Sequence, residues 1–265
     1  MKLRIALVQM EINDGKKDEN LKNALSHLKE IKKLKEVPDI VCLPELFTSG
    51  YDLRNTPQYA ESIPSSTIEK IKEISEDKFI VIGSILEKDE GKFFNTAFIL
   101  NKKGNIIGKY RKVHLFSPML EKEFLTPGNE MDIFTIEELD DLKIGLAICY
   151  DLRFPELFRI LTLKGAKIIF LPSEFPSPKR DAWKTLIRSR AIENQIYIVG
   201  VNRVGQGKSN HFFGNSIMTN GEFIVILNNK PQIKIVDIDV AELKKIRNNL
   251  PLLKDRREDL YSFKI

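Results

Sequence analysis

The sequence predicts an α/β protein in which mixed sheets carry helices on their outer sides, folded as one domain over residues 1–265. Short apolar, β-branched runs alternate with amphipathic helical patterns, and this alternation is typical of parallel βαβ units. Two pairs of strands joined by polar turns interrupt the alternation, which indicates antiparallel hairpins within the same sheets. The chain shows no linker-like change of composition and no internal repeat.

Strands and helices alternate through the first third of the chain. Leu3–Val8 is a short apolar, β-branched run, which indicates a buried strand. Residues 18–35 place apolar side chains at helical spacing with charges between them, and this predicts an amphipathic helix. The next expected elements are a strand at Asp39–Leu43, a helix at Ser66–Ser75 capped by Ser65 or Ser66, and a strand at Phe79–Leu86.

A hairpin and a second alternating series follow. The hairpin is expected from Phe94–Leu100 and Ile106–Arg111, which flank a polar turn. The later elements are expected as a strand at Leu142–Ile148, a helix at Pro155–Lys164, a strand at Lys167–Leu171, a helix at Lys179–Glu193, a strand at Ile196–Val201, a hairpin of Phe213–Thr219 with Glu222–Leu227, and a strand at Gln232–Val240.

A short helix and a polar tail, from about residue 248 to 265, close the chain. The tail carries apolar side chains, so we expect it to pack on the body or on a second subunit. These side chains are Leu252, Leu253, Leu260, Tyr261 and Phe263.

Composition excludes several function classes. The chain has 42 Lys plus Arg and 37 Asp plus Glu, a net charge of +5, and the two signs are interspersed. This predicts a mixed, hydrated surface with no nucleic-acid partner. No apolar run approaches the roughly 18 residues of a membrane span, and the first ten residues are too short an apolar run for a signal peptide.

Few thiols and imidazoles are available for chemistry. Two cysteines, Cys42 and Cys149, cannot supply a disulfide framework, so a reducing compartment, the cytoplasm, is expected. With His27, His114 and His211 they form no CxxC or HxxxH spacing, so no metal is expected. Cys42 lies within an apolar strand run, where packing accounts for it.

The segment Gly205–Ser209 ends like a phosphate-binding loop, but two features argue against that interpretation. Asn202 stands where the first glycine of such a loop is required, and a strand rather than a helix follows. We interpret the segment as a polar surface loop.

Cys149 is the strongest candidate for a reactive group. A buried strand runs directly into it, and Pro155 then suits the first turn of a helix. A thiol at a strand-to-helix turn lies near free backbone N–H groups, which stabilise a thiolate and the oxyanion of a tetrahedral intermediate. The alternative is a small buried hydrophobe, but Asp151 and Arg153 immediately beyond favour a reactive position.

A nucleophilic thiol requires a base, and the candidates are the histidines His114 and His211 and the carboxylate of Glu45. In an extended segment Lys112 and His114 would face the same side, which leaves a Cys149–His114 dyad open. Glu45 closes an apolar strand and is flanked by Pro, Leu and Phe, a setting that suits a carboxylate base near neutral pH. His27 lies on the first predicted helix and is expected at the surface.

Three sequence blocks lie in a recognisable order: Glu45 in LPELFTSGY, Lys112 in YRKVHLF and Cys149 in ICYDLRFPE. With them the chain resembles the nitrilase superfamily of carbon–nitrogen hydrolases over essentially its whole length. The catalytic triad of that family is Glu–Lys–Cys. A further family glutamate lies six residues before the proline of a Pro-Gly pair, and Pro127-Gly128 places it at Glu121.

The resemblance implies a role for each of these residues. Glu45 would act as the base for the nucleophile Cys149, and Lys112 with the backbone N–H of Tyr150 would hold the oxyanion. Glu121 would orient Lys112 or assist proton transfers. In this scheme His114 is a structural neighbour, and no metal or organic cofactor takes part.

The branch of the family is indicated by CYDLRFPEL, Trp183 and the segment Ser189–Gly205, which are most similar to omega-amidase-like enzymes. Their substrates are small omega-amides of dicarboxylic 2-oxo acids, with α-ketoglutaramate the usual one. N-carbamoyl amidohydrolases and deaminated-glutathione amidases share much of the same pattern. True nitrilases usually carry Trp in place of Tyr150, which disfavours nitrile hydrolysis.

The family resemblance also places substrate contacts. Tyr51, Phe116 and Phe175 lie near the family's pocket-forming positions. A substrate carboxylate needs a cation, and the sequence offers Arg153, Arg203 and Lys179 without selecting among them.

The fold implied by the resemblance is a four-layer α-β-β-α sandwich with two mixed β-sheets and outer helices. Family members usually form homodimers or larger assemblies, often through the helix after the catalytic cysteine and the C-terminal tail. Two other hypotheses stay open at this point: a Cys149–His114 thiol acyltransferase or protease, and a non-catalytic binding protein on the same scaffold.

Overall fold

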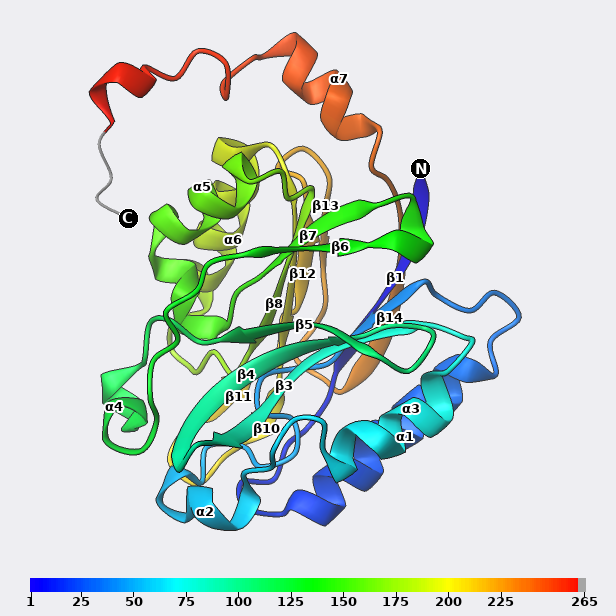
Figure 1. Ribbon diagram of the computed structural model, residues 1–265, viewed down its shortest axis with the longest axis vertical. Coiled ribbons are helices and arrows are strands. Elements are labelled where there is room, and N and C mark those ends of the chain that lie inside the picture. The colour runs from blue at the N-terminus through cyan, green and yellow to red at the C-terminus, as the bar shows by residue number, and fades with distance from the viewer. Residues whose placement is uncertain (262–265) are drawn as a thin grey trace.

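Two six-stranded mixed sheets lie face to face in the computed structural model, which describes residues 1–261, and helices cover both outer faces (Figure 1). Phe263 of the predicted tail lies outside the described residues. The first sheet has the order β14-β1-β2-β3-β4-β5. Its strands are β1 (Lys2–Gln9), β2 (Ile40–Cys42), β3 (Ile80–Asp89), β4 (Lys92–Leu100), β5 (Ile106–Arg111) and β14 (Gln232–Asp239).

The second sheet has the order β13-β12-β9-β8-β7-β6. Its strands are β6 (Ile133–Ile136), β7 (Leu142–Leu146), β8 (Ile168–Ser173), β9 (Tyr197–Asn202), β12 (Ile217–Thr219) and β13 (Ile224–Ile226). The centre of each sheet is parallel: β1, β2 and β3 in the first, β7, β8 and β9 in the second. The flanking pairs are antiparallel, as in the mixed sheets that the sequence predicts.

The core has one layer between the sheets and one under each pair of helices. Ile5 and Ile40 of the first sheet share an apolar cluster with Ile144 and Phe170 of the second, so the two sheets pack directly on each other. The opposite face of the first sheet packs against α1 (Lys17–Lys32) and α3 (Ser66–Ser75), through side chains such as Val41.

The helices α5 (Pro155–Leu163) and α6 (Arg180–Asn194) cover the second sheet, which completes the four-layer α-β-β-α sandwich. Pro155 opens α5, and the Ser65 hydroxyl accepts a hydrogen bond from the N–H of Ile68 at the start of α3; both were expected from the sequence. Shorter helices are α2 (Thr56–Tyr59), α4 (Glu121–Phe124) and α7 (Glu242–Asn249). Within residues 1–261, no helix combines the length and the apolar character needed to cross a bilayer.

The second predicted hairpin differs from the observed structure. The expected strand Phe213–Thr219 breaks at Gly214 and Asn215, which have φ of 63° and 53° and cannot continue a strand. Its first part is β11 (His211–Phe213), which pairs with β10 (Val204–Gln206) in a separate two-stranded sheet. Only the remainder joins β13 as predicted.

The tail leaves α7 and returns over the end of the second sheet toward α5 (Figure 1). Its beginning is attached to the body, because the side-chain amide of Gln195 donates to the Leu250 carbonyl at 2.7 Å. Leu260 and Tyr261 are 67% and 51% exposed. Packing of the tail on a second subunit therefore stays a prediction.

Candidate active site

The predicted site residues follow strand ends at one edge of the sandwich. Glu45 comes just after β2, Lys112 directly after β5, and Cys149 just after β7. The carboxyl ends of parallel strands are where ligands bind in open α/β sheets, because the loops that leave them converge there. Two stacked sheets bring loops from both to the same place.

A fully buried ion cluster forms the centre of the site. The Lys112 Nζ lies 2.8 Å from the Oε1 atoms of both Glu45 and Glu121. The Tyr51 hydroxyl donates to the same two carboxylates, at 2.8 Å and 2.9 Å, and accepts from Lys112 at 3.2 Å. All three charged side chains have no exposed surface, so their interactions are little screened by water.

The charges of this cluster depend on one another. Burial alone would lower the pKa of Lys112, but the Glu121 and Glu45 carboxylates hold it above its usual value. Burial raises the pKa of Glu121, against the opposing effect of the Lys112 ammonium. Burial, reinforced by the two carboxylates, also raises the pKa of Tyr51 well above its usual value. Lys112 is therefore a permanent cation, and Tyr51 a permanent hydrogen-bond donor, at neutral pH.

Four donors hold the carboxylate of Glu45. Its Oε1 accepts from Lys112, from the Tyr51 hydroxyl, and from the Asn95 side-chain amide at 2.8 Å. Its Oε2 accepts from the backbone N–H of Glu174 at 2.7 Å. A carboxylate with both oxygens bonded has a defined orientation, which a proton-transfer group requires.

Cys149 lies close enough to Glu45 for the charge of that carboxylate to act on the pKa of its thiol. It is 4% exposed, and burial followed by the Glu45 charge raises its pKa well above the usual value. The resting group is therefore a thiol, and it can attack an electrophile only if a neighbouring base removes its proton. Glu45 is placed to do so.

Left-handed backbone accompanies each part of the site. Cys149 has φ of 43°, Leu46 directly after Glu45 has 40°, and Leu120 directly before Glu121 has 65°. For residues with a side chain this conformation is unfavourable, and it persists where the surroundings impose it, often at functional sites.

His114 lies apart from the thiol. Its Nδ1 is 2.8 Å from Asp151, and its ring stacks on Phe154 with centroids 3.7 Å apart. The expected alternation of Lys112 with His114 fails because β5 ends at Arg111, so the two side chains are not on one strand. The Cys149–His114 dyad therefore lacks a geometric basis.

Asp151 connects the loop of Cys149 to the loop of Lys112. Its Oδ2 accepts from the N–H of Ile148 and from the Tyr110 hydroxyl, both at 2.8 Å. Its Oδ1 accepts from the backbone N–H of His114 at 3.1 Å. Because it is fully buried, Asp151 fixes the two loops relative to each other.

The small hollow in front of Cys149 is lined by aromatic and cationic side chains. Arg153 lies over the Phe175 ring at 5.4 Å, and Lys179 lies over the Phe116 ring at 4.8 Å. Tyr150 completes the wall. Of the three cations that the sequence offered, the structure places Arg153 and Lys179 here.

Arg203 is not among the residues of this hollow. It has no exposed surface, and its guanidinium is paired with Asp14 at 2.8 Å and Glu174 at 2.6 Å. This differs from the expectation of a substrate contact, because the guanidinium is taken up by the protein's own carboxylates.

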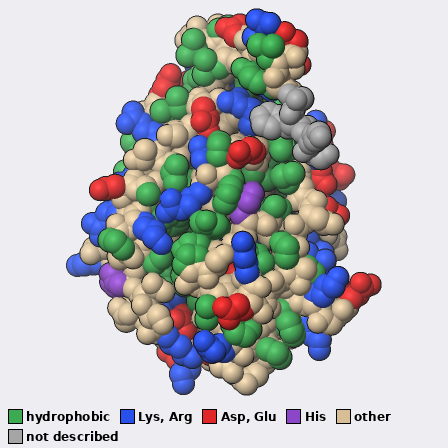
Figure 2. All heavy atoms as spheres, turned by 90° about the vertical axis from the view of Figure 1, so that its left-hand side faces the viewer, with side chains coloured by type: hydrophobic (Ala, Val, Ile, Leu, Met, Phe, Trp, Pro, Cys, Tyr) green, Lys and Arg blue, Asp and Glu red, His purple; other side chains and the backbone are tan. Residues whose placement is uncertain are grey.

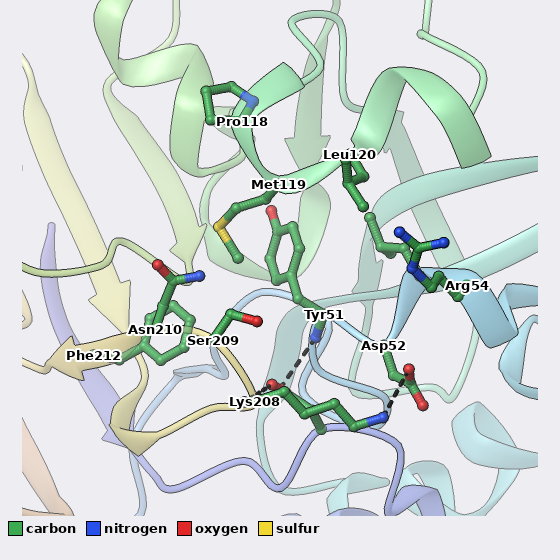
Figure 3. A pocket seen from close by; sticks show the side chains of 12 residues that line it. Tyr51, Asp52, Arg54, Pro118, Met119, Leu120, Lys208, Ser209, Asn210 and Phe212 are labelled. Carbon is green, nitrogen blue, oxygen red and sulfur yellow. Dashed lines mark hydrogen bonds and ion pairs between the residues drawn. The ribbon is translucent and has the colours of Figure 1, made fainter.

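A larger cavity of about 210 Å³ adjoins Tyr51 (Figure 3). Its walls include Pro118, Met119 and Leu120 on one side and the loop around Lys208 on the other. An ion pair of Lys208 with Asp52, at 2.9 Å, closes the rim. Phe116 lines the hollow at Cys149, so the segment 116–120 contributes side chains to both spaces.

Sequence reasoning missed Asn95 and Glu174. Glu174 follows β8 in LPSEF, which closely repeats the LPELF around Glu45, so a second strand-end glutamate was a usable signal. Asn95 lies inside β4, where only its polarity among apolar neighbours distinguishes it.

Within residues 1–261, no group of three or more His, Cys, Asp or Glu is arranged to hold a metal ion.

Comparison with known proteins identifies the family of the chain. It matches the carbon–nitrogen hydrolase family over residues 4–248. It is 37% identical to the 2-oxoglutaramate amidase of Bacillus subtilis (strain 168), covering 98% of this chain and 100% of that one. It is 34% identical to the human omega-amidase NIT2, covering 98% and 96%.

A solved structure has the same fold as this chain. Saccharomyces cerevisiae Nit3, a member of branch 10 of the nitrilase superfamily, superposes with a TM-score of 0.88 at 32% identity, covering 97% of each chain. A family match over most of the chain, near full-length relatives and a shared fold lead to one conclusion. The chain belongs to the carbon–nitrogen hydrolase family.

Proposed function

We propose that the protein hydrolyses a small carboxamide, an omega-amide of a 2-oxo dicarboxylic acid such as α-ketoglutaramate, to a carboxylate and ammonia. The observation that carries the proposal is the buried Glu45–Lys112–Glu121 cluster beside the Cys149 thiol. The substrate class is supported by the near full-length likeness to a 2-oxoglutaramate amidase and an omega-amidase.

The first half of the reaction forms a thioester. Glu45 removes the proton from the Cys149 sulfur, and the sulfur attacks the amide carbon. Negative charge moves to the amide oxygen, where the Lys112 ammonium and the N–H of Tyr150 receive it. This N–H lies in the first turn of a short helix, where backbone donors lack an intrahelical partner. The carbon–nitrogen bond then breaks, and Glu45 returns its proton to the departing ammonia.

The second half releases the acid. Glu45, again ionised, takes a proton from water, and the hydroxide equivalent attacks the thioester carbon. The carbon–sulfur bond breaks, and the thiolate recovers the proton from Glu45. Glu121 keeps Lys112 in place through its 2.8 Å contact. No other co-reactant is needed to balance these steps.

The substrate carboxylate is bound by cations at the mouth of the hollow. Arg153 and Lys179 are both partly exposed there, and each lies over an aromatic ring that limits its movement. Lys179→Met is expected to raise KM for a dicarboxylic amide roughly tenfold, with little effect on an uncharged amide. An equal effect on both amides would contradict this assignment.

The direct test is ammonia release from a panel of small amides and N-carbamoyl compounds, ranked by kcat/KM, with wild type and Cys149→Ala. We expect α-ketoglutaramate to rank first and Cys149→Ala to be inactive. Equal rates in both proteins would reject the thioester route. A carbamoyl compound or deaminated glutathione ranking first would keep the chemistry and change the substrate.

A homodimer or larger homo-oligomer belongs to the same proposal. Large apolar side chains are exposed on α5, α6 and the tail, among them Leu163 at 46%, Ile192 at 48% and Leu250 at 55%. Figure 2 shows hydrophobic side chains gathered on the side of the molecule that carries α4 and α5. Covering such surfaces with a second copy removes apolar area from water. Light scattering is expected to give at least twice the 30.5 kDa chain mass.

A cytoplasmic location stays a prediction from the two free cysteines.

A further inference from the structure

The Arg203 guanidinium lies at the far point of a closed path that begins and ends at Glu45 and runs through hydrogen bonds and through the covalent chains of Tyr51 and Glu174. We define the Arg203 ring as Glu45, Tyr51, Asp14, Arg203 and Glu174. The side chains of Glu45, Arg203 and Glu174 have no exposed surface, and that of Asp14 is 5% exposed. Of its members, only Glu45 takes part in the mechanism proposed above.

One arm of the ring leads through Tyr51. Its hydroxyl donates to Glu45 Oε1 at 2.8 Å, and its backbone N–H donates to Asp14 Oδ1 at 3.2 Å. The Nη1 of Arg203 donates to the same Oδ1 at 2.8 Å. The position of the Tyr51 hydroxyl therefore depends on a carboxylate that Arg203 holds.

The other arm leads through Glu174. The Nη1 of Arg203 donates to Glu174 Oε2 at 2.6 Å. The backbone N–H of Glu174 donates to Glu45 Oε2 at 2.7 Å. Each oxygen of Glu45 thus accepts from a residue that Arg203 contacts, Glu174 directly and Tyr51 through Asp14.

Stability alone is a poor reason for this arrangement. Taking one cation and two carboxylates out of water is costly, and buried ion pairs often stabilise a fold less than apolar side chains of the same size. Arg203 also donates to the Ile12 carbonyl and lies over the Phe212 ring at 4.2 Å, so it is held from several directions. Such a rigid, buried charge suits a group that must fix geometry.

The orientation of the Glu45 carboxylate has to be fixed by groups outside its own side chain. The terminal torsion of a glutamate side chain has broad minima, so packing of its methylene groups does not set the plane of the carboxylate. Donors on both oxygens do set it. A reacting group displaced by about 1 Å can lose on the order of a hundredfold in rate.

We propose that Arg203 is a positioning residue, which aims the Glu45 carboxylate at the Cys149 thiol through the Tyr51 and Glu174 arms and does not touch the substrate. The inference rests on the proposed function in one respect, that Glu45 is the base. It replaces the expectation that Arg203 binds a substrate carboxylate.

The test opens the ring on either side. In Glu174→Ala and in Asp14→Ala, kcat for α-ketoglutaramate is expected to fall about 10- to 100-fold with KM within about threefold. Glu174→Gln retains an oxygen that can accept from Arg203, so it is expected to recover most of the loss. The kcat of the double variant Asp14→Ala/Glu174→Ala is expected to be little below that of the less active single variant. Either substitution alone already breaks the continuous path of contacts through Arg203.

A matched control is Glu61→Ala. Glu61 is a partly buried carboxylate, with its side chain 14% exposed, and pairs with Lys17 at 3.2 Å outside the ring. It should lose stability without losing kcat. Alkylation of Cys149 by iodoacetamide, followed by peptide mass mapping, gives a second readout that needs no substrate assignment. We expect the ring variants to slow it in parallel with kcat, as Glu45→Gln does.

Two results would overturn the inference: ring variants that change KM alone, or ring variants that lower Tm while kcat and alkylation stay at the wild-type level. Multiplying effects in the double variant would also contradict a single ring. If Glu45→Gln itself leaves alkylation unchanged, the base assignment in the proposed function fails. If Glu45→Gln slows alkylation and the ring variants do not, only the role of Arg203 fails.

Discussion

At the scale of single residues, the site combines a thiol whose pKa is raised with a carboxylate that four donors hold and that we propose as its base. Burial and the Glu45 charge keep the pKa of Cys149 high, so free thiolate is scarce and the thiol is protected from unspecific oxidation. The permanent cation Lys112 lies next to both Glu45 and Glu121. Reactivity therefore requires a substrate that receives the sulfur while Glu45 receives the proton.

This arrangement predicts opposite outcomes for two conservative substitutions. Glu45→Gln keeps the shape of the side chain but cannot take a proton, so kcat should fall by roughly 10²- to 10⁴-fold. His114→Asn loses a contact to Asp151 and a stacked ring but no proton acceptor for Cys149, so kcat should stay within about tenfold. Steady-state ammonia release at matched pH measures both. The reverse order would restore histidine as the base.

At the scale of elements, the strands β3, β4 and β5 are joined by a charged cluster next to Lys112. The Glu87 side chain on β3 accepts from Thr96 on β4 at 2.6 Å, and from Lys109 and Arg111 on β5 at 2.9 Å and 2.8 Å. Burial would raise the pKa of Glu87, but these donors outweigh it and lower the pKa to about 2. The cluster fixes the end of β5, from which Lys112 enters the site.

The pH dependence of stability follows from that value. Because the folded pKa of about 2 lies below the ordinary 4.5, ionised Glu87 stabilises the fold above pH 4.5, and this contribution is lost as pH falls toward 2. Glu87→Gln should lower Tm by roughly 5 °C at pH 7. The difference from wild type should shrink between pH 4.5 and the lowest pH at which both proteins fold. Asp89→Asn is the control, because Asp89 also pairs with Arg111 but is 49% exposed, and it should change Tm little. A constant difference across that range would contradict the assignment.

The elements also show what sequence reasoning can reach. Long apolar runs such as Leu142–Ile148 and clear helical spacing in residues 18–35 predicted their elements well. The short strand β6 has only four residues, too few for its pattern to predict a strand, and it pairs with β7 at the edge of the second sheet. The break at Gly214 comes from backbone conformation, and the Gln9 side chain, which lies against Gly214, closes that position to a larger residue.

At the scale of the whole molecule, stacking two sheets gathers loops that are remote in sequence. Glu45 and Glu174 are bonded across 129 positions, and Asp14 and Arg203 across 189. Glu45, Lys112 and Cys149 were predicted because each lies in a distinctive local block at a strand end. The Arg203 ring was not predicted, since no local pattern records which strand ends meet, and Arg203 alone resembles any strand-end cation that could bind a substrate.

The central claim is that turnover passes through a thioester on Cys149. Rapid mixing of wild type with α-ketoglutaramate, acid quenching and intact-mass spectrometry tests it most directly. The account predicts a transient protein mass increased by the amide less ammonia, mapped to Cys149 and absent in Cys149→Ala. Ammonia released at the wild-type rate by Cys149→Ala, with no adduct in either protein, would contradict it.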